Sequence, residues 1–181
     1  MVFYARNIDT MIAFVLPLTP QDVPAVSVLA GKIWRYHYTG IIATGQIEYM
    51  LMQRYQPALI KEQLSNPGIW WKKLVLGKDI IGFCCCTRTA NPNELKIDKL
   101  YIHCDHHRQG YGALLVADAV EILRENELQT LVLTVNKHNL TAISAYRHYG
   151  FEIVNDSIVD IGGGFVMNDY LMMLNFNKWN V

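Results

Sequence analysis

The sequence is poor in charge. Of its 181 residues only 18% are charged, and 16 basic residues balance 16 acidic ones, so the formal net charge is zero. Disordered chains combine low hydrophobicity with high net charge, and this composition excludes that class. Nucleic-acid-binding proteins use a surplus of Lys and Arg to contact phosphates. We therefore expect a folded protein without a nucleic-acid partner.

Long hydrophobic runs are also missing. The longest apolar stretch near the start covers 11–18 and contains Pro17, whereas a helix that spans a bilayer needs about 20 apolar residues. The segment before it carries Arg6 and Asp9 and no small-residue cleavage site, so we expect no signal peptide. The sequence thus predicts no membrane partner.

Cysteine is scarce and poorly spaced for binding a metal. The four cysteines are Cys84, Cys85, Cys86 and Cys104. Three of them are consecutive, and on a strand consecutive side chains point to opposite faces, so these three cannot converge on one ion. Buried, reduced thiols are typical of proteins in the cytoplasm. We expect a cytoplasmic location and no metal site.

The pattern of apolar residues and turn residues predicts an α+β fold. Thr19 is expected to cap the first helix, with Pro20 at the first helical position. Residues 1–10 are expected to form a loose arm, and no linker divides the remainder, which predicts one domain over 1–181. The expected strands cover 11–18, 70–76, 80–87, 94–102, 131–135, 151–160 and 165–176, and the expected helices cover 20–34, 44–55, 58–64, 110–126 and 140–149.

A loop with two glycines is expected between the fourth strand and the fourth helix. It contains Gly110 and Gly112, and His106, His107 and Arg108 precede them. Glycine lets a ligand approach the backbone closely, and the first amides of a helix have no partner within it. These features favour a phosphate or pyrophosphate ligand. The pattern also fits a plain strand-to-helix turn, because the third glycine of a dinucleotide motif is missing.

A second informative segment lies on the last expected helix. Asn139, Ala142 and Tyr146 share one face of that helix, and Gly150 with Phe151 follows it. The small Ala142 side chain leaves room for a ligand between an amide and a phenol. An ordinary core helix with an inward tyrosine would give the same pattern.

Together the two segments resemble the GNAT superfamily, the acetyl-CoA-dependent N-acetyltransferases. The first is similar to the pyrophosphate motif Q/R-x-x-G-x-G/A of that family, and the second to its Asn…Ala…Tyr…Gly-Phe signature. One position departs, because His107 stands where the family has Gln or Arg, with Arg108 and Gln109 directly after it. The resemblance extends from Met11 to Phe176 and implies a single domain with a central mixed, mostly antiparallel sheet flanked by helices.

The resemblance implies an acyltransferase that moves an acetyl group from acetyl-CoA, its co-substrate, directly to a primary amine in a ternary complex. A backbone N–H near Leu100 or Tyr101 would polarise the thioester carbonyl, and Tyr146 would protonate the departing thiolate. Two neighbouring strands, 94–102 and 131–135, would separate beside the pantetheine arm. The residues that the resemblance assigns to cofactor binding are Leu100, Tyr101, Ile102, His107, Arg108, Gln109, Gly110, Tyr111, Gly112, Ala113, Asn139, Ala142 and Tyr146.

The acceptor amine also needs a base. An amine with a pKa of about 10.4 is mostly protonated at pH 7, and its deprotonation costs about 4.6 kcal/mol. Glu94 and Asp98 share one face of the strand that leads to the site and are the candidate catalytic bases. His103, His106 and His138 are rivals for this role.

Several alternatives stay open. The acyl group could differ from acetyl, the acceptor could be a protein amine, or the chain could be a non-catalytic acyl-CoA-binding module. The aromatic residues of the first two helices, among them Trp34, Tyr38 and Tyr55, belong either to the core or to an aromatic acceptor cleft. Polyamine, antibiotic, amino acid and peptide acceptors all fit, and so does a homodimer formed through the last strands.

Overall fold

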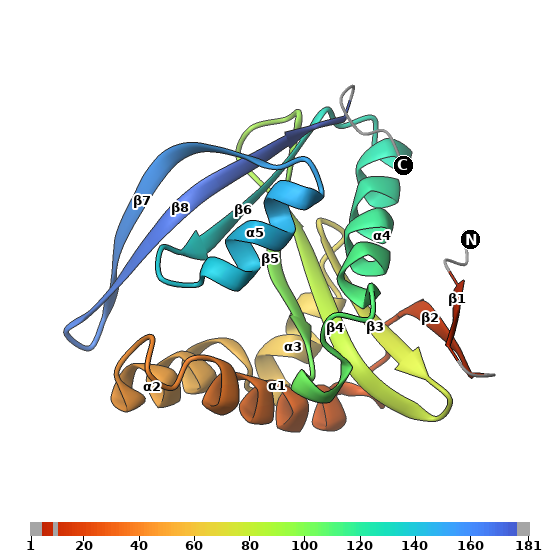
Figure 1. Ribbon diagram of the computed structural model, residues 1–181, viewed down its shortest axis with the longest axis horizontal. Coiled ribbons are helices and arrows are strands. Elements are labelled where there is room, and N and C mark those ends of the chain that lie inside the picture. The colour runs from red at the N-terminus through yellow and green to blue at the C-terminus, as the bar shows by residue number, and fades with distance from the viewer. Residues whose placement is uncertain (1–4, 9–10, 177–181) are drawn as a thin grey trace. The chain divides into compact units, whose positions relative to one another are not determined.

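From residue 11 onward, the strands and helices follow one another in the order that the sequence predicts. The computed structural model describes residues 5–8 and 11–176, and Figure 1 traces their path. The α+β fold class is confirmed. The strands are β1 (Ala5–Ile8), β2 (Met11–Pro17), β3 (Ile69–Leu76), β4 (Asp79–Arg88), β5 (Glu94–Ile102), β6 (Thr130–Asn136), β7 (Glu152–Gly162) and β8 (Phe165–Asn175). The helices are α1 (Val23–His37), α2 (Thr44–Arg54), α3 (Pro57–Leu64), the 3-10 turn η1 (Cys104–His106), α4 (Tyr111–Glu125) and α5 (Leu140–His148).

The chain divides into two compact units. Unit 1 comprises the chain up to Cys86 together with Lys99–Asp118, and unit 2 comprises Thr87–Asp98 together with the chain from Ala119 onward. The boundaries fall inside β4, β5 and α4, so each of these elements begins in one unit and ends in the other. The single domain over 1–181 stays a prediction.

Unit 1 contains β1, β2 and β3 with most of β4 and the end of β5, and these strands are hydrogen-bonded in the order β1-β2-β3-β4-β5. β1 pairs antiparallel with β2, so residues 5–8 of the expected arm form a strand, contrary to the expectation of a loose segment. Residues 1–4 and 9–10 of that arm lie outside the described residues. The segment 81–86 of β4 is buried at every position, and this places Cys84, Cys85 and Cys86 in the core as free thiols.

The first helix begins later than predicted. Thr19 does not cap it, because Asp22 holds the N-cap position and α1 starts at Val23, with Pro24 in the first turn. The Asp22 carboxylate instead accepts hydrogen bonds from the Thr19 backbone N–H at 2.8 Å and from the Thr19 hydroxyl at 2.7 Å. Thr19 and Asp22 therefore close a turn before the helix, and Pro20 lies in that turn.

Unit 2 contains the strand order β5-β6-β8-β7. β5 and β6 are parallel, while β6 and β8 and then β7 and β8 are antiparallel. With the antiparallel pairs of unit 1, this confirms a mixed, mostly antiparallel arrangement. Gly163 and Gly164 link β7 to β8 with φ values of 65° and 79°, the left-handed backbone that a two-residue hairpin requires. Figure 1 shows β7 and β8 as one long hairpin.

The core of unit 2 lies along the paired strands. Leu131 on β6 is opposite Leu174 on β8, and Leu133 is opposite Met172. All four side chains are buried. Among the described residues, no helix is both long enough and apolar enough to cross a membrane.

Candidate active site

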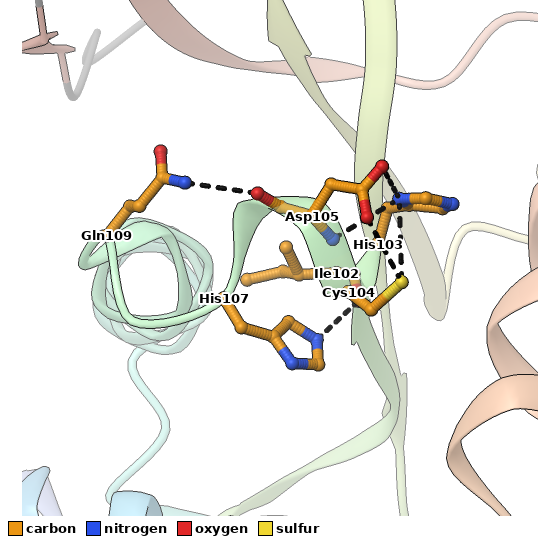
Figure 2. Close-up of polar contacts among 6 residues, drawn as sticks. All are labelled: Ile102, His103, Cys104, Asp105, His107 and Gln109. Atoms are coloured by element: carbon orange, nitrogen blue, oxygen red, sulfur yellow. Dashed lines mark hydrogen bonds and ion pairs between the residues drawn. The ribbon is translucent and has the colours of Figure 1, made fainter.

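The first predicted segment folds in unit 1 as a strand end, one 3-10 turn and the start of a helix (Figure 2). Gln109 donates from Nε2 to the carbonyl oxygen of Asp105 at 3.1 Å. The His107 ring lies with Nε2 2.9 Å from the carbonyl oxygen of Ile102. These two contacts connect the loop between η1 and α4 to the end of β5 and to η1.

His107 occupies the position at which the sequence departs from the family motif. Its Nε2 faces a carbonyl oxygen, which can only accept, so this nitrogen carries the hydrogen. A phosphate contact through Nε2 would have to replace the bond to Ile102. The structure therefore gives the His107 side chain a local partner, and its predicted part in cofactor binding stays a prediction.

The backbone before α4 is tightly turned. Arg108 has a φ of 59° and Gly110 a φ of 81°. For a residue other than glycine this left-handed conformation costs about 1 kcal/mol or more, and such strain gathers at ligand sites. The Arg108 side chain is exposed. Exposed positive charge and a strained turn at the start of a 15-residue helix fit an anionic ligand such as pyrophosphate.

Tyr111, Gly112 and Ala113 form the first turn of α4. The Tyr111 side chain is only 1% exposed and its ring lies 6.2 Å from that of His106, centroid to centroid. Burial leaves the backbone of Tyr111 as its means of contact with a ligand. Gly112 and Ala113 are partly exposed.

The end of β5 carries the predicted oxyanion donors. Leu100, Tyr101 and Ile102 are all partly exposed. A Cβ atom on Gly82 would lie 2.7 Å from the Tyr101 carbonyl oxygen, so only glycine lets the two backbones approach this closely. The hydroxyl groups of Tyr101 and Tyr38 are 3.3 Å apart.

Aromatic residues at the ends of α1 and α2 pack around Tyr101. Trp34, Tyr38 and Tyr55 are 2%, 8% and 3% exposed, and Trp34 donates from Nε1 to the Tyr55 hydroxyl at 3.1 Å. Burial raises the pKa of the Tyr55 phenol far above its ordinary value. These three side chains belong to the core of unit 1.

Glu94 and Asp98 lie in unit 2, on the same face of β5. The parallel pairing of β5 with β6 runs from Glu94–Thr130 to Ile97–Leu133. Both strands continue, β5 to Ile102 and β6 to Asn136, without further pairing between them. The Asp98 carboxylate is 3.7 Å from the Lys96 ammonium, and its side chain is 14% exposed.

The second predicted segment forms α5 in unit 2, and two of its motif residues contact each other. Asn139 is the N-cap, and its Oδ1 accepts a hydrogen bond from the Ala142 backbone N–H at 3.2 Å. The side chain is buried, at 6% exposure. Asn139 therefore begins the helix, and the cap occupies the amide oxygen of a residue that was predicted to bind the cofactor.

The other end of the motif explains how α5 ends. Gly150 has a φ of 91° and donates to the Arg147 carbonyl at 3.0 Å, while Phe151 donates to the Tyr146 carbonyl at 2.9 Å. This pair of bonds is a Schellman motif. The Tyr146 and Phe151 rings pack 5.7 Å apart, centroid to centroid, which completes its usual hydrophobic contact. Tyr146 is half-buried.

The predicted site residues thus form two sets. The set in unit 1 comprises Leu100, Tyr101, Ile102, His107, Arg108, Gln109, Gly110, Tyr111, Gly112 and Ala113, and the set in unit 2 comprises Glu94, Asp98, Asn139, Ala142 and Tyr146. The first set runs along the end of β5, the loop after η1 and the start of α4, whereas the second set divides between β5 and α5 with its N-cap.

Sequence reasoning missed two polar groupings. Asp169 on β8 is buried at 6% exposure and stands opposite Asn136, which is equally buried, on β6. The signal in the sequence was Asp169 itself, an acidic residue among the apolar residues of the expected strand 165–176. Around η1, the donor atoms of His103, Cys104 and Asp105 lie within 4.8 Å of one another. The consecutive residues His103, Cys104 and Asp105 were the available signal.

Cys104 is not set up as a nucleophile. Burial raises the pKa of its thiol, and the hydrogen bond to the Asp105 carboxylate with the charge of that carboxylate raises it further. Its Sγ is 3.9 Å from Nδ1 of His103. A reactive thiol needs a lowered pKa, so this Cys–His contact does not favour a covalent acyl-enzyme.

Comparison with known proteins identifies the family. Residues 39–151 match the model of the acetyltransferase (GNAT) family, which is more than half of the chain. The chain belongs to the GNAT acetyltransferase family. It is therefore an acetyltransferase with acetyl-CoA as co-substrate, as the two motifs implied.

Individual relatives of this GNAT chain are distant. A spermidine N(1)-acetyltransferase from Thermoplasma acidophilum is 23% identical over 154 residues, which cover 83% of this chain and 92% of the relative. The structure of PaiA N-acetyltransferase from the same organism, in complex with coenzyme A, aligns with a TM-score of 0.77 at 21% identity over 90% of this chain and 98% of that one. A GCN5-related N-acetyltransferase from Rhodopseudomonas palustris aligns with a TM-score of 0.74 at 18% identity, over 97% and 98% of the two chains. These structures share the fold.

Proposed function

We propose that this GNAT acetyltransferase transfers an acetyl group from acetyl-CoA to a primary amine of a small, cationic acceptor. The Asn139…Ala142…Tyr146…Gly150-Phe151 motif, folded as one capped helix, carries this proposal, since it presents a phenol at a fixed place. The likeness to a spermidine acetyltransferase supports a polyamine as the first acceptor to test.

Acetyl-CoA fits the residues of the loop before α4. The strained backbone at Arg108, the left-handed Gly110 and the exposed guanidinium suit the negative charge of a pyrophosphate. In this proposal the backbone amides of Gly110, Tyr111 and Gly112 bind phosphate oxygens, with His107, Arg108, Gln109 and Ala113 around them.

The remaining groups would act on the transfer itself. A backbone N–H at Leu100 or Tyr101 would stabilise the negative charge that develops on the thioester oxygen, and Ile102 would hold the pantetheine arm. Tyr146 would donate its phenol proton to the departing thiolate. Asn139 and Ala142 would line the arm, where the buried Asn139 amide can donate.

The proton of the acceptor amine would leave to a carboxylate. Asp98 and Glu94 remain the proposed bases, both on one face of β5. Asp98 lies next along the strand after the last residue paired with β6, Ile97. The raised thiol pKa of Cys104 supports direct attack by the amine over a covalent acyl-enzyme.

A cytoplasmic location is part of the proposal and is supported by the four free cysteines.

The experiment measures thiol release from acetyl-CoA with spermidine and a panel of other amines, for the wild type and for Tyr146→Phe. We expect kcat to fall by about 10²-fold in Tyr146→Phe, because the departing thiolate loses its proton donor. Tyr149→Phe is the matched control, since it removes a half-buried phenol from the same helix end. A loss of less than about threefold in Tyr146→Phe would exclude the acid role.

The same assay sorts the bases and the alternatives. The pH–rate profile is measured for Asp98→Asn and for Glu94→Gln. The variant that lacks the catalytic base should lose the acidic limb of this profile. An unchanged limb in both would exclude a carboxylate on β5. If acetyl-CoA raises the melting temperature but no amine is acetylated, the chain is a binding module.

A further inference from the structure

Three different ligand atoms meet around the 3-10 turn η1. They are Nδ1 of His103, Sγ of Cys104 and the carboxylate of Asp105, and each lies within 4.8 Å of the others. Figure 2 shows the three side chains gathered on one side of the turn, away from Gln109. The segment lies wholly within unit 1, and the proposed acetyl transfer does not use it.

The contacts between these three residues are close in length to the edges of a tetrahedral zinc site. Sγ of Cys104 is 3.9 Å from His103 Nδ1 and 3.5 Å from Asp105 Oδ1, and His103 Nδ1 is 3.5 Å from Asp105 Oδ2. Zinc bonds of about 2.3 Å to sulfur and about 2.0–2.2 Å to nitrogen and oxygen put tetrahedral ligands about 3.6 Å apart for S···N and S···O and about 3.4 Å apart for N···O. The two contacts of Asp105 use different carboxylate oxygens, and one donor atom from each residue lies within 4.8 Å of the others, so an ion bound by all three requires the Asp105 carboxylate to turn toward it.

The His103 ring is also in a suitable chemical state. Nδ1 of His103 accepts a long hydrogen bond of 3.4 Å from the Asp105 backbone N–H, so it is the ring nitrogen with the lone pair. The His103 side chain is 28% exposed and that of Asp105 76%, which leaves a path for an ion and a fourth position for water. One thiol, one imidazole and one carboxylate suit Zn²⁺ and disfavour Mg²⁺ or Ca²⁺, which prefer oxygen.

We propose that His103, Cys104 and Asp105 form a three-ligand binding site for Zn²⁺ or a similar thiophilic divalent cation. The proposal concerns binding and adds no metal to the acetyl transfer. The ion would fix η1, the turn that begins the loop to α4. This site was not predicted from the sequence, because the three consecutive cysteines, which lie on β4, indicated that no metal is bound.

The test uses the untagged, reduced, full-length protein. Calorimetric titration with Zn²⁺ should give one ion per chain, and Co²⁺ should produce the charge-transfer absorption of a cobalt–thiolate bond. Cys104→Ser should abolish that absorption while Cys84, Cys85 and Cys86 remain in place. His103→Gln and Asp105→Asn should each raise the Kd for Zn²⁺ at least tenfold, since even the outer partners of metal ligands contribute 10–100-fold.

His106→Gln is the matched control. His106 belongs to the same 3-10 turn, and its ring lies 6.3 Å from that of His103, centroid to centroid, but it is not one of the three ligands. The affinity of the His106→Gln variant for Zn²⁺ should equal that of the wild type. The proposal is overturned if the wild type binds no Zn²⁺, if Cys104→Ser keeps the cobalt–thiolate absorption, or if His106→Gln loses binding. Circular dichroism spectra of the variants confirm that each one folds.

Discussion

At the scale of single residues, local hydrogen bonds decide what a side chain is available for. His107 and Asn139 were expected to contact acetyl-CoA, yet each binds its own backbone surroundings, at Ile102 and Ala142. Asn139 thereby gains a structural role as helix cap in addition to its proposed one. Substitution of either residue would alter the local fold as well as ligand binding.

Asp22 provides a prediction about pH. Burial by itself raises the pKa of this carboxyl, but hydrogen bonds from Lys73 and Thr19 outweigh it, so the pKa lies below the ordinary value of 3.8. The Lys73 ammonium is 2.6 Å from the carboxylate. A lowered folded-state pKa adds stability above the unfolded pKa, and this stability is lost as the pH falls through the folded value.

We therefore expect Asp22→Asn to lower the free energy of unfolding at pH 7 and to change it progressively less as the pH falls below about 4, where the wild-type carboxyl protonates too. Urea unfolding at several pH values measures this difference. Asp79→Asn, at an exposed position on β4, is the control. A difference that stays constant from pH 7 to pH 3 would contradict the role of the charge.

At the scale of elements, two helices end in the same motif with different residues. At the end of α4, Glu127 donates to the Arg124 carbonyl and Leu128 to the Leu123 carbonyl. At the end of α5, Gly150 and Phe151 make the equivalent bonds. The left-handed position is held by Glu127, with a φ of 57°, in one case and by Gly150 in the other. Only glycine adopts that conformation without strain.

The two positions predict opposite effects. Glu127→Gly should raise the free energy of unfolding by about 0.5–1 kcal/mol, because it removes the strain of a side chain at positive φ. Gly150→Ala should lower the free energy of unfolding by about 1–2 kcal/mol, because it introduces a side chain at positive φ. The new Cβ atom would also lie only 3.2 Å from Leu174 Cδ1. Urea unfolding of both variants measures the difference. A loss of stability in Glu127→Gly would show that its side chain contributes more than the strain costs.

At the scale of the whole molecule, the two units are joined by shared elements. β4, β5 and α4 each run from one unit into the other. Because a strand or helix loses its neighbours cooperatively, we expect both units to unfold in one transition.

Tryptophan fluorescence tests this expectation in a Trp179→Phe background, where Trp34, Trp70 and Trp71 of unit 1 remain. Far-ultraviolet circular dichroism reports on the helices and strands of both units. The two urea unfolding curves should coincide. Separate midpoints would mean that the units fold independently and would count against the single domain predicted over 1–181.

Most elements could be predicted from the sequence because their signals are local. The expected strand 94–102 is β5 to the residue, and Gly150 marks the end of α5, since φ above zero requires glycine there. The start of α1 could not be predicted. Thr19 and Pro20 look like a cap, but Asp22 is held by Lys73 on β3, 51 positions away in the sequence.

The sequence by itself determined the family, because its two motifs place particular residue types at fixed spacing along short segments. It also determined the fold class, since hydrophobic periodicity is a local property. Only the tertiary structure decided which donor atoms meet. The contacts of His107 with Ile102, of Tyr101 with Tyr38, and of His103 with Cys104 and Asp105 depend on backbone turns and side-chain rotamers that folding fixes. The zero net charge is likewise only a sum over the chain. The fold decides where individual charged residues lie: Arg108 is exposed before α4, whereas Asp169 is buried on β8.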